Sequence, residues 1–123
     1  MLHTASFYDP QDWKGQCYRV SRAHPRGRRT QWEVAPFLYP DRQLLRAYRR
    51  GDLDFAALSL EYKQGLDEAY GQSEQFQGWA LSLAGLESVT LLCFEREGKP
   101  CHRRVAADWL SERIPGLEAG GLR

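Results

Sequence analysis

Apolar positions along the chain predict three strands. Residues 2–8 are mostly apolar and end at the breaker pair Asp9-Pro10, and residues 17–22 alternate between apolar and polar side chains. Residues 89–94 (VTLLCF) are apolar almost throughout, which is typical of a strand covered on both faces in a parallel sheet. Pro36 and Pro40 interrupt residues 32–39, so we expect irregular structure there.

Helical periodicity predicts four helices. The first spans 41–50, with Leu44, Leu45 and Tyr48 on one face and arginines on the other. Asp52 is the expected N-cap of the second helix. Ser73 is the expected N-cap of the third helix, which ends near residue 85, and the fourth helix begins at Pro100. The apolar stripe of the second helix is Phe55, Leu58, Tyr62 and Leu66. That of the third is Phe76, Trp79, Ala80 and Leu83, and that of the fourth is Val105, Ala106, Trp109 and Leu110. The Gly-rich tail from residue 115 is expected to fray.

Strands separated by helices indicate an α/β protein, with a mostly parallel sheet flanked by helices. The 123 residues are enough for one domain with a single core, so residues 1–123 are predicted to form it. No apolar run approaches the ~20 residues that cross a bilayer, and no signal peptide is apparent. Three cysteines are too few for a secreted disulfide framework, so we expect free thiols, a cytoplasmic location and no membrane partner.

Charge is unevenly distributed although the net charge is only +1. The segment between Asp12 and Glu33 lacks acidic residues, yet it contains Lys14, Arg19, Arg22, Arg26, Arg28 and Arg29. A guanidinium group offers a fork of donors that suits phosphate or carboxylate. A small anionic ligand or a nucleic acid is therefore the expected partner.

Cysteine, histidine and arginine gather where the strand at 89–94 gives way to the last helix. Ligands of open α/β sheets usually bind beyond the carboxyl ends of the strands, where helices begin. Cys101 would lie in the first helical turn, near unpaired N–H groups that stabilise a thiolate or an anion. If the strands at 17–22 and 89–94 run parallel, the basic loop shares this end. We assign acid/base or thiol chemistry to Cys93, Cys101 and His102, and anion binding to Arg22, Arg26 and Arg103.

Other interpretations stay open. Cys93 also fits as a small buried hydrophobe, His102 as a capping or packing residue, and the arginines of helix 41–50 as a solvated face. A second hypothesis is a nucleic-acid-binding module that uses loop 22–29 and helix 41–50. A third is a redox-responsive protein in which Cys93 and Cys101 pair reversibly, and a fourth is a structural or interaction domain.

Several familiar motifs are missing from the sequence. The segment CFEREGKPCHR lacks the C-x5-R spacing of cysteine phosphatases, and C-x7-C-H is not a customary structural zinc spacing. There is no G-x-G-x-x-G and no Walker loop. Metal and nucleotide cofactors are therefore disfavoured, and we predict none.

The last third of the chain resembles the C-terminal signature of the domain of unknown function 488 family. The matching residues are Leu91, Leu92, Cys93, Phe94, Glu95, Cys101, His102 and Arg103. The N-terminal half is similar to the YeaO-like branch through Tyr18, Arg19, Val20, Arg22, Pro25, Arg26, Gly27, Trp32, Pro36, Phe55 and Tyr62. Ser21 and His24 stand where that branch usually has Asp and Trp. The resemblance spans about residues 2–114 and implies a compact Rossmann-like fold without specifying a reaction.

Overall fold

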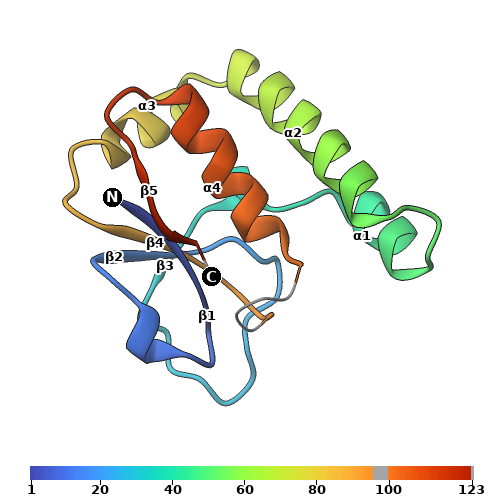
Figure 1. The fold of residues 1–123 in the computed structure, drawn as a ribbon, viewed down its shortest axis with the longest axis horizontal. Helices are drawn as coiled ribbons and strands as arrows, with labels where there is room; N and C mark the ends of the chain where they lie inside the picture. Colours follow the sequence, from blue (N-terminus) through green and yellow to red (C-terminus); the bar gives the residue numbers. More distant parts are fainter. Residues whose placement is uncertain (96–99, 123) are drawn as a thin grey trace.

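The computed structural model describes residues 1–95 and 100–122, which form a five-stranded sheet with helices packed against it (Figure 1). The strand order is β3-β2-β4-β1-β5, and every pairing is parallel. The strands are β1 Leu2–Ser6, β2 Gln16–Arg19, β3 Glu33–Val34, β4 Val89–Cys93 and β5 Ala119–Leu122. This confirms the predicted α/β class, and the Rossmann-like description is consistent with it.

Four α-helices connect these strands: α1 Arg42–Arg49, α2 Phe55–Gln72, α3 Glu74–Leu83 and α4 His102–Arg113. Two short 3-10 helices, η1 Pro10–Asp12 and η2 Pro36–Leu38, lie in the loops. The side chains of Asp41, Asp54 and Ser73 cap α1, α2 and α3 by accepting a backbone N–H three residues later. The prediction that Asp52 caps α2 is wrong, because the N-cap is Asp54. Asp52 instead forms an ion pair with Arg50.

Strand β4 lies at the centre of the sheet, between β1 and β2. Cys93 pairs with Ser6, and Leu92 pairs with Arg19. β2 ends earlier than predicted, at Arg19, although the N–H of Val20 still donates to the carbonyl of Leu92 at 3.0 Å. Parallel pairing places the carboxyl ends of β2 and β4 at the same edge, so the loop after β2 approaches the start of α4.

Each face of the sheet carries its own apolar cluster. The larger cluster joins the sheet to α2, α3 and α4 and includes Leu91, Tyr62, Phe76 and Leu110. The opposite face holds Ala5, Phe7, Cys17, Trp32 and Leu92, with Trp13 packed against them. Because successive strand residues point to opposite faces, Cys93 lies on the helix side while Leu92 points away.

The C-terminal tail is a strand, so the predicted fraying from residue 115 is wrong. β5 pairs with β1, and the N–H of Leu2 donates to the carbonyl of Glu118 at 2.8 Å. A Cβ on Gly120 would lie 2.6 Å from Cε1 of His3, so a side chain at this position would require the buried His3 ring to move. The irregular structure predicted for residues 32–39 is wrong for most of that segment. β3 takes Glu33–Val34 and pairs with β2, and η2 takes Pro36–Leu38, a 3-10 turn that begins at the proline. None of the helices in the described ranges has the length and apolar character required to span a membrane.

Candidate functional site

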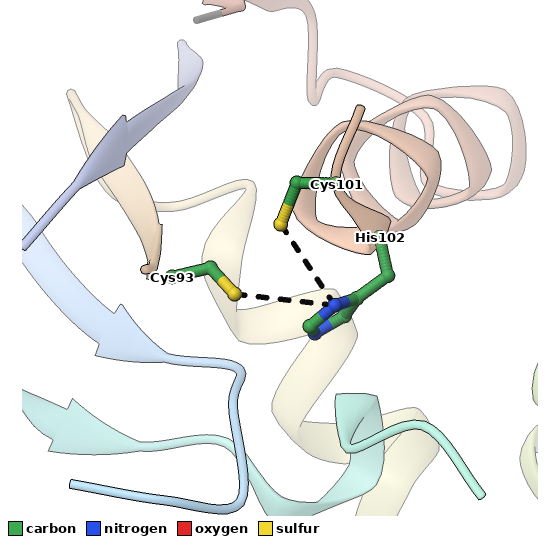
Figure 2. A group of neighbouring side chains, drawn as sticks. All are labelled: Cys93, Cys101 and His102. Carbon is green, nitrogen blue, oxygen red and sulfur yellow. Dashed lines mark hydrogen bonds between the residues drawn. The ribbon is translucent and has the colours of Figure 1, made fainter. Parts of the chain in front are cut away.

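Two cysteines and a histidine meet where β4 ends and α4 begins (Figure 2). Cys93 is the last residue of β4, Cys101 is the N-cap of α4, and His102 is its first helical residue. Nδ1 of His102 lies 4.0 Å from Sγ of Cys93 and 3.9 Å from Sγ of Cys101. The predicted trio for thiol or acid/base chemistry is therefore one contiguous cluster.

Backbone contacts fix the orientation of the imidazole. The side chains of Cys93, Cys101 and His102 are only 3%, 4% and 7% exposed. Nε2 of His102 lies 2.8 Å from the carbonyl oxygen of Val20 and must donate to it, since a carbonyl can only accept. The ring of Tyr62 packs against the imidazole at 5.6 Å between centroids. Nδ1 is thereby directed at the two sulfur atoms.

The cluster favours a thiolate at Cys101. A hydrogen bond from Cys93 lowers the pKa of Cys101, and the hydrogen bond and charge of His102 and the charge of Arg103 lower it further, against the effect of burial. The same hydrogen bond, together with burial, raises the pKa of Cys93, which keeps its proton. Burial lowers the pKa of His102, but the hydrogen bond and charge of Cys101 outweigh it and the net shift is upward. Cys101 also lies at the positive end of α4, which favours negative charge there.

A cavity of about 290 Å³ opens beside the cluster. This is near the lower end of the range for ligand pockets, so it suits a small molecule or a terminal group of a larger one. Three segments form its wall: the loop after β2, helix α1 together with Pro40 shortly before it, and the end of β4 with the start of α4. The lining residues are Ser21, Arg22, Ala23, Pro40, Arg42, Leu45, Arg46, Arg49, Cys93, Phe94, Glu95 and His102.

Arg22 is held at the cavity by its neighbours. Its Nε donates to the carbonyl oxygen of Pro40 at 3.0 Å, and its guanidinium lies 5.7 Å from the centre of the Tyr39 ring. The Tyr39 hydroxyl in turn accepts a hydrogen bond from Arg19. The guanidinium therefore has a supported position at the cavity, and its role in anion binding stays a prediction.

Three arginines of α1 complete the basic wall of the cavity. Arg42, Arg46 and Arg49 recur at helical spacing and are solvent-exposed, as expected of a solvated face, and they also line the cavity. Within residues 1–95 and 100–122, none of them forms an ion pair. The carboxylate of Glu95 also lines the cavity, and burial raises its pKa. Repeated arginines without acidic partners four residues away were the signal for this wall.

Comparison with known families identifies the relatives of this chain. A family model described as the active DUF488-N3 subclade matches residues 2–114. The chain belongs to this DUF488 family. The match confirms the predicted membership, whereas the YeaO-like half and the Cys-His-Arg signature stay predictions. Comparisons with curated proteins and with solved structures returned no match.

Two arginines predicted to bind an anion lie outside the cavity wall of this DUF488 protein. Arg26 is exposed in the loop after β2 and does not line the cavity. Arg103 does not line it either, because its side chain is fully buried in the first turn of α4. Its charge reaches the cavity indirectly, by stabilising the Cys101 thiolate. Only Arg22 of the three predicted arginines is placed for direct contact with a ligand.

Proposed function

We propose that this DUF488 protein binds a small anionic ligand, phosphate or nucleotide-like, in the cavity beside the Cys93, Cys101 and His102 cluster. Arg22, Arg42, Arg46 and Arg49 are the proposed anion-binding residues. The thiol and histidine groups are proposed to act on the ligand once it is bound.

One observation carries this proposal: arginines from two segments separated in sequence line a single small cavity. Arg22 comes from the loop after β2, whereas Arg42, Arg46 and Arg49 come from α1. The four guanidinium groups are exposed and form no ion pair among the described residues, so this cavity presents positive charge that an anionic ligand would neutralise. Bidentate contacts from guanidinium groups suit phosphate and carboxylate equally.

The thiol and histidine groups support a reactive function over simple storage of an anion. The thiolate is the nucleophilic form of cysteine, and the Cys101 environment favours it. His102 contacts both sulfur atoms and lines the cavity, so it can transfer protons between them and a ligand. The description of the matched subclade as active agrees with such a role.

We also propose a cytoplasmic location. Cys17, Cys93 and Cys101 are all free thiols, as reducing compartments maintain them. The cluster depends on that state, because a disulfide would consume both sulfur atoms.

Calorimetric titration of the full chain with inorganic phosphate and with a nucleoside monophosphate tests the binding proposal. We expect a single site, and Arg22→Gln should weaken it by about tenfold or more, the size of a lost charged hydrogen bond. Arg26→Gln is the matched control, since Arg26 belongs to the same loop but lies outside the cavity wall. Equal affinity in the wild type and Arg22→Gln would refute the assignment.

Salt dependence separates this proposal from nucleic-acid binding. A pocket that holds one phosphate should lose affinity with a shallow slope against salt concentration, of about one unit on logarithmic axes. A nucleic-acid surface formed by loop 22–29 and α1 should instead prefer an oligonucleotide and show a slope of several units. Oligonucleotide binding with the steep slope would replace the pocket proposal.

A further inference from the structure

The two cysteines and the histidine at the end of β4 offer three donor atoms to a single point in space. Sγ of Cys93, Sγ of Cys101 and Nδ1 of His102 all lie within 4.8 Å of one another. Figure 2 shows both sulfur atoms pointing toward the same edge of the imidazole. The three side chains come from two elements, so the strand end and the helix start jointly define the group.

The spacing of these atoms is close to that of zinc ligands. Tetrahedral zinc with bonds of ~2.3 Å to sulfur and ~2.05 Å to nitrogen places S and N ~3.6 Å apart. The observed S···N distances are 4.0 and 3.9 Å, so each contact needs to shorten by only a few tenths of an ångström. The two sulfur atoms lie within 4.8 Å of each other, whereas tetrahedral zinc places two thiolate sulfurs ~3.8 Å apart, so metal binding would also draw the two cysteine side chains together.

The histidine already has the arrangement typical of a metal ligand. Metal-binding histidines almost always donate their second ring N–H to a carboxylate or a backbone carbonyl, which fixes the tautomer. Nε2 of His102 makes this hydrogen bond to the carbonyl of Val20, at 2.8 Å. In the neutral ring the lone pair is then on Nδ1, the atom that faces the sulfur atoms.

Charge and softness specify the cation. Two thiolates and a neutral imidazole balance a divalent cation, so the loaded site would carry no net charge in this buried position. Thiolate and imidazole together select zinc-like cations over magnesium or calcium, which prefer oxygen. A metal was not expected from the sequence, because C-x7-C-H is not a customary structural zinc spacing and no further Cys/His cluster completes four ligands. In the structure, the end of β4 and the start of α4 bring the three ligands together.

We propose that Cys93, Cys101 and His102 bind one zinc-like divalent cation, with the fourth coordination position open to the arginine-lined cavity. Cys93 and His102 line that cavity, and Oε2 of Glu95 lies 3.4 Å from Sγ of Cys93. Three protein ligands with one open position is the arrangement of catalytic rather than structural zinc. A water molecule or the anion of the proposed function would occupy the open position. In the metal-loaded form both thiolates and Nδ1 of His102 are taken up as ligands, so the thiol and proton-transfer chemistry of the proposed function belongs to the metal-free form.

Cobalt(II) titration of the full, reduced, metal-free chain tests this site. The absorption spectrum of bound cobalt identifies its ligands, because thiolate coordination produces a charge-transfer band and tetrahedral geometry produces intense visible bands. We expect both bands to saturate at one equivalent of cobalt and to disappear when zinc is added. Absence of the charge-transfer band, or its growth without saturation, would overturn the proposal.

Substitutions assign the ligands. Cys93→Ser, Cys101→Ser and His102→Gln should each weaken cobalt binding by at least tenfold. Cys17→Ser is the matched control, because Cys17 is an equally buried thiol on the opposite face of the sheet. Retention of the cobalt bands by Cys101→Ser, or their loss in Cys17→Ser, would refute the assignment. The wild-type titration stands independently if a ligand variant does not fold.

Metal binding and anion binding are measured separately. Arg46→Gln should keep the cobalt bands while phosphate affinity falls, and Cys101→Ser should lose the bands. Phosphate binding by the metal-free wild type tests the proposed function alone. Failure of either proposal can therefore be recognised without reference to the other.

Discussion

Replacing Arg46 with glutamine should stabilise the protein and at the same time weaken its binding of phosphate. Arg46 lies on α1 between Arg42 and Arg49, four and three residues away, and all three line the cavity. Like-charged pairs at these spacings destabilise a helix by about 0.2–0.5 kcal/mol each. Removing two such pairs should raise the free energy of unfolding by about 0.4–1 kcal/mol, reduced by the loss of the favourable interaction between Arg46 and the negative end of α1, in whose last turn it lies. Glutamine has nearly the helix propensity of arginine, so propensity does not obscure the effect.

Urea denaturation at low ionic strength, in a buffer free of phosphate, measures this gain. The difference between Arg46→Gln and the wild type should shrink as salt is added, because salt screens repulsion between exposed charges. Added phosphate should reverse the order, since a ligand stabilises the form that binds it better. Arg26→Gln, outside α1 and the cavity wall, should show neither the gain nor the loss of binding. A variant that binds phosphate as well as the wild type does would refute the assignment of α1 to the anion site.

Three further predictions concern the cluster and the fold. In metal-free protein, the ultraviolet thiolate absorbance should appear well below the ordinary thiol pKa of 9.0 and disappear in Cys101→Ser. Folding lowers the pKa of Cys101, so this thiol makes the free energy of unfolding rise with pH between its folded pKa and 9.0. A pH profile of stability that is flat in this range and unchanged in Cys101→Ser would contradict the lowered pKa. Tyr62→Phe should cost about 1–2 kcal/mol in urea denaturation, because its buried hydroxyl donates to the carbonyl of Leu38 at 2.6 Å; a loss below about 0.3 kcal/mol would show the bond to be unimportant. Gly15→Ala should cost more than about 2 kcal/mol, since Gly15 has φ +65° and its Cβ would lie 2.0 Å from the backbone oxygen of Ser88; normal thermal stability would contradict the described turn.

Much of the fold was predictable because its main elements carry local signals. The apolar run at β4 and the stripe of Leu58, Tyr62 and Leu66 on α2 appear in the structure as expected. β5 was not predicted because its two central glycines interrupt any apolar pattern, and only its pairing with β1 shows that it is a strand. The cap of α2 was misplaced because Asp52 and Asp54 are both capping residue types, and only the path of the backbone decides between them.

The site was predictable in its chemistry and less so in its geometry. Cys93, Cys101 and His102 could be brought together from sequence, since parallel strands and the helix that follows share one edge. The positions of Arg26 and Arg103 could not be inferred, because side-chain direction in a loop or a first helical turn depends on tertiary packing. The role of Arg42, Arg46 and Arg49 required knowledge of which face α1 turns toward the loop after β2.

The position of β1 in the sheet also governs the order in which this protein can fold. The Ser6 hydroxyl donates to the carbonyl of Phe94, a residue 88 positions later, and the other edge of β1 is closed by β5. During synthesis β1 therefore leaves the ribosome long before its neighbours β4 and β5 have been made. Helices α1, α2 and α3 need only local contacts to form. Non-local parallel pairing of this kind is slow, and an open apolar strand edge invites pairing with other chains. A nascent chain halted before β4 would leave that edge unpaired, so we expect such a chain to associate with other chains until β4 and β5 have been made.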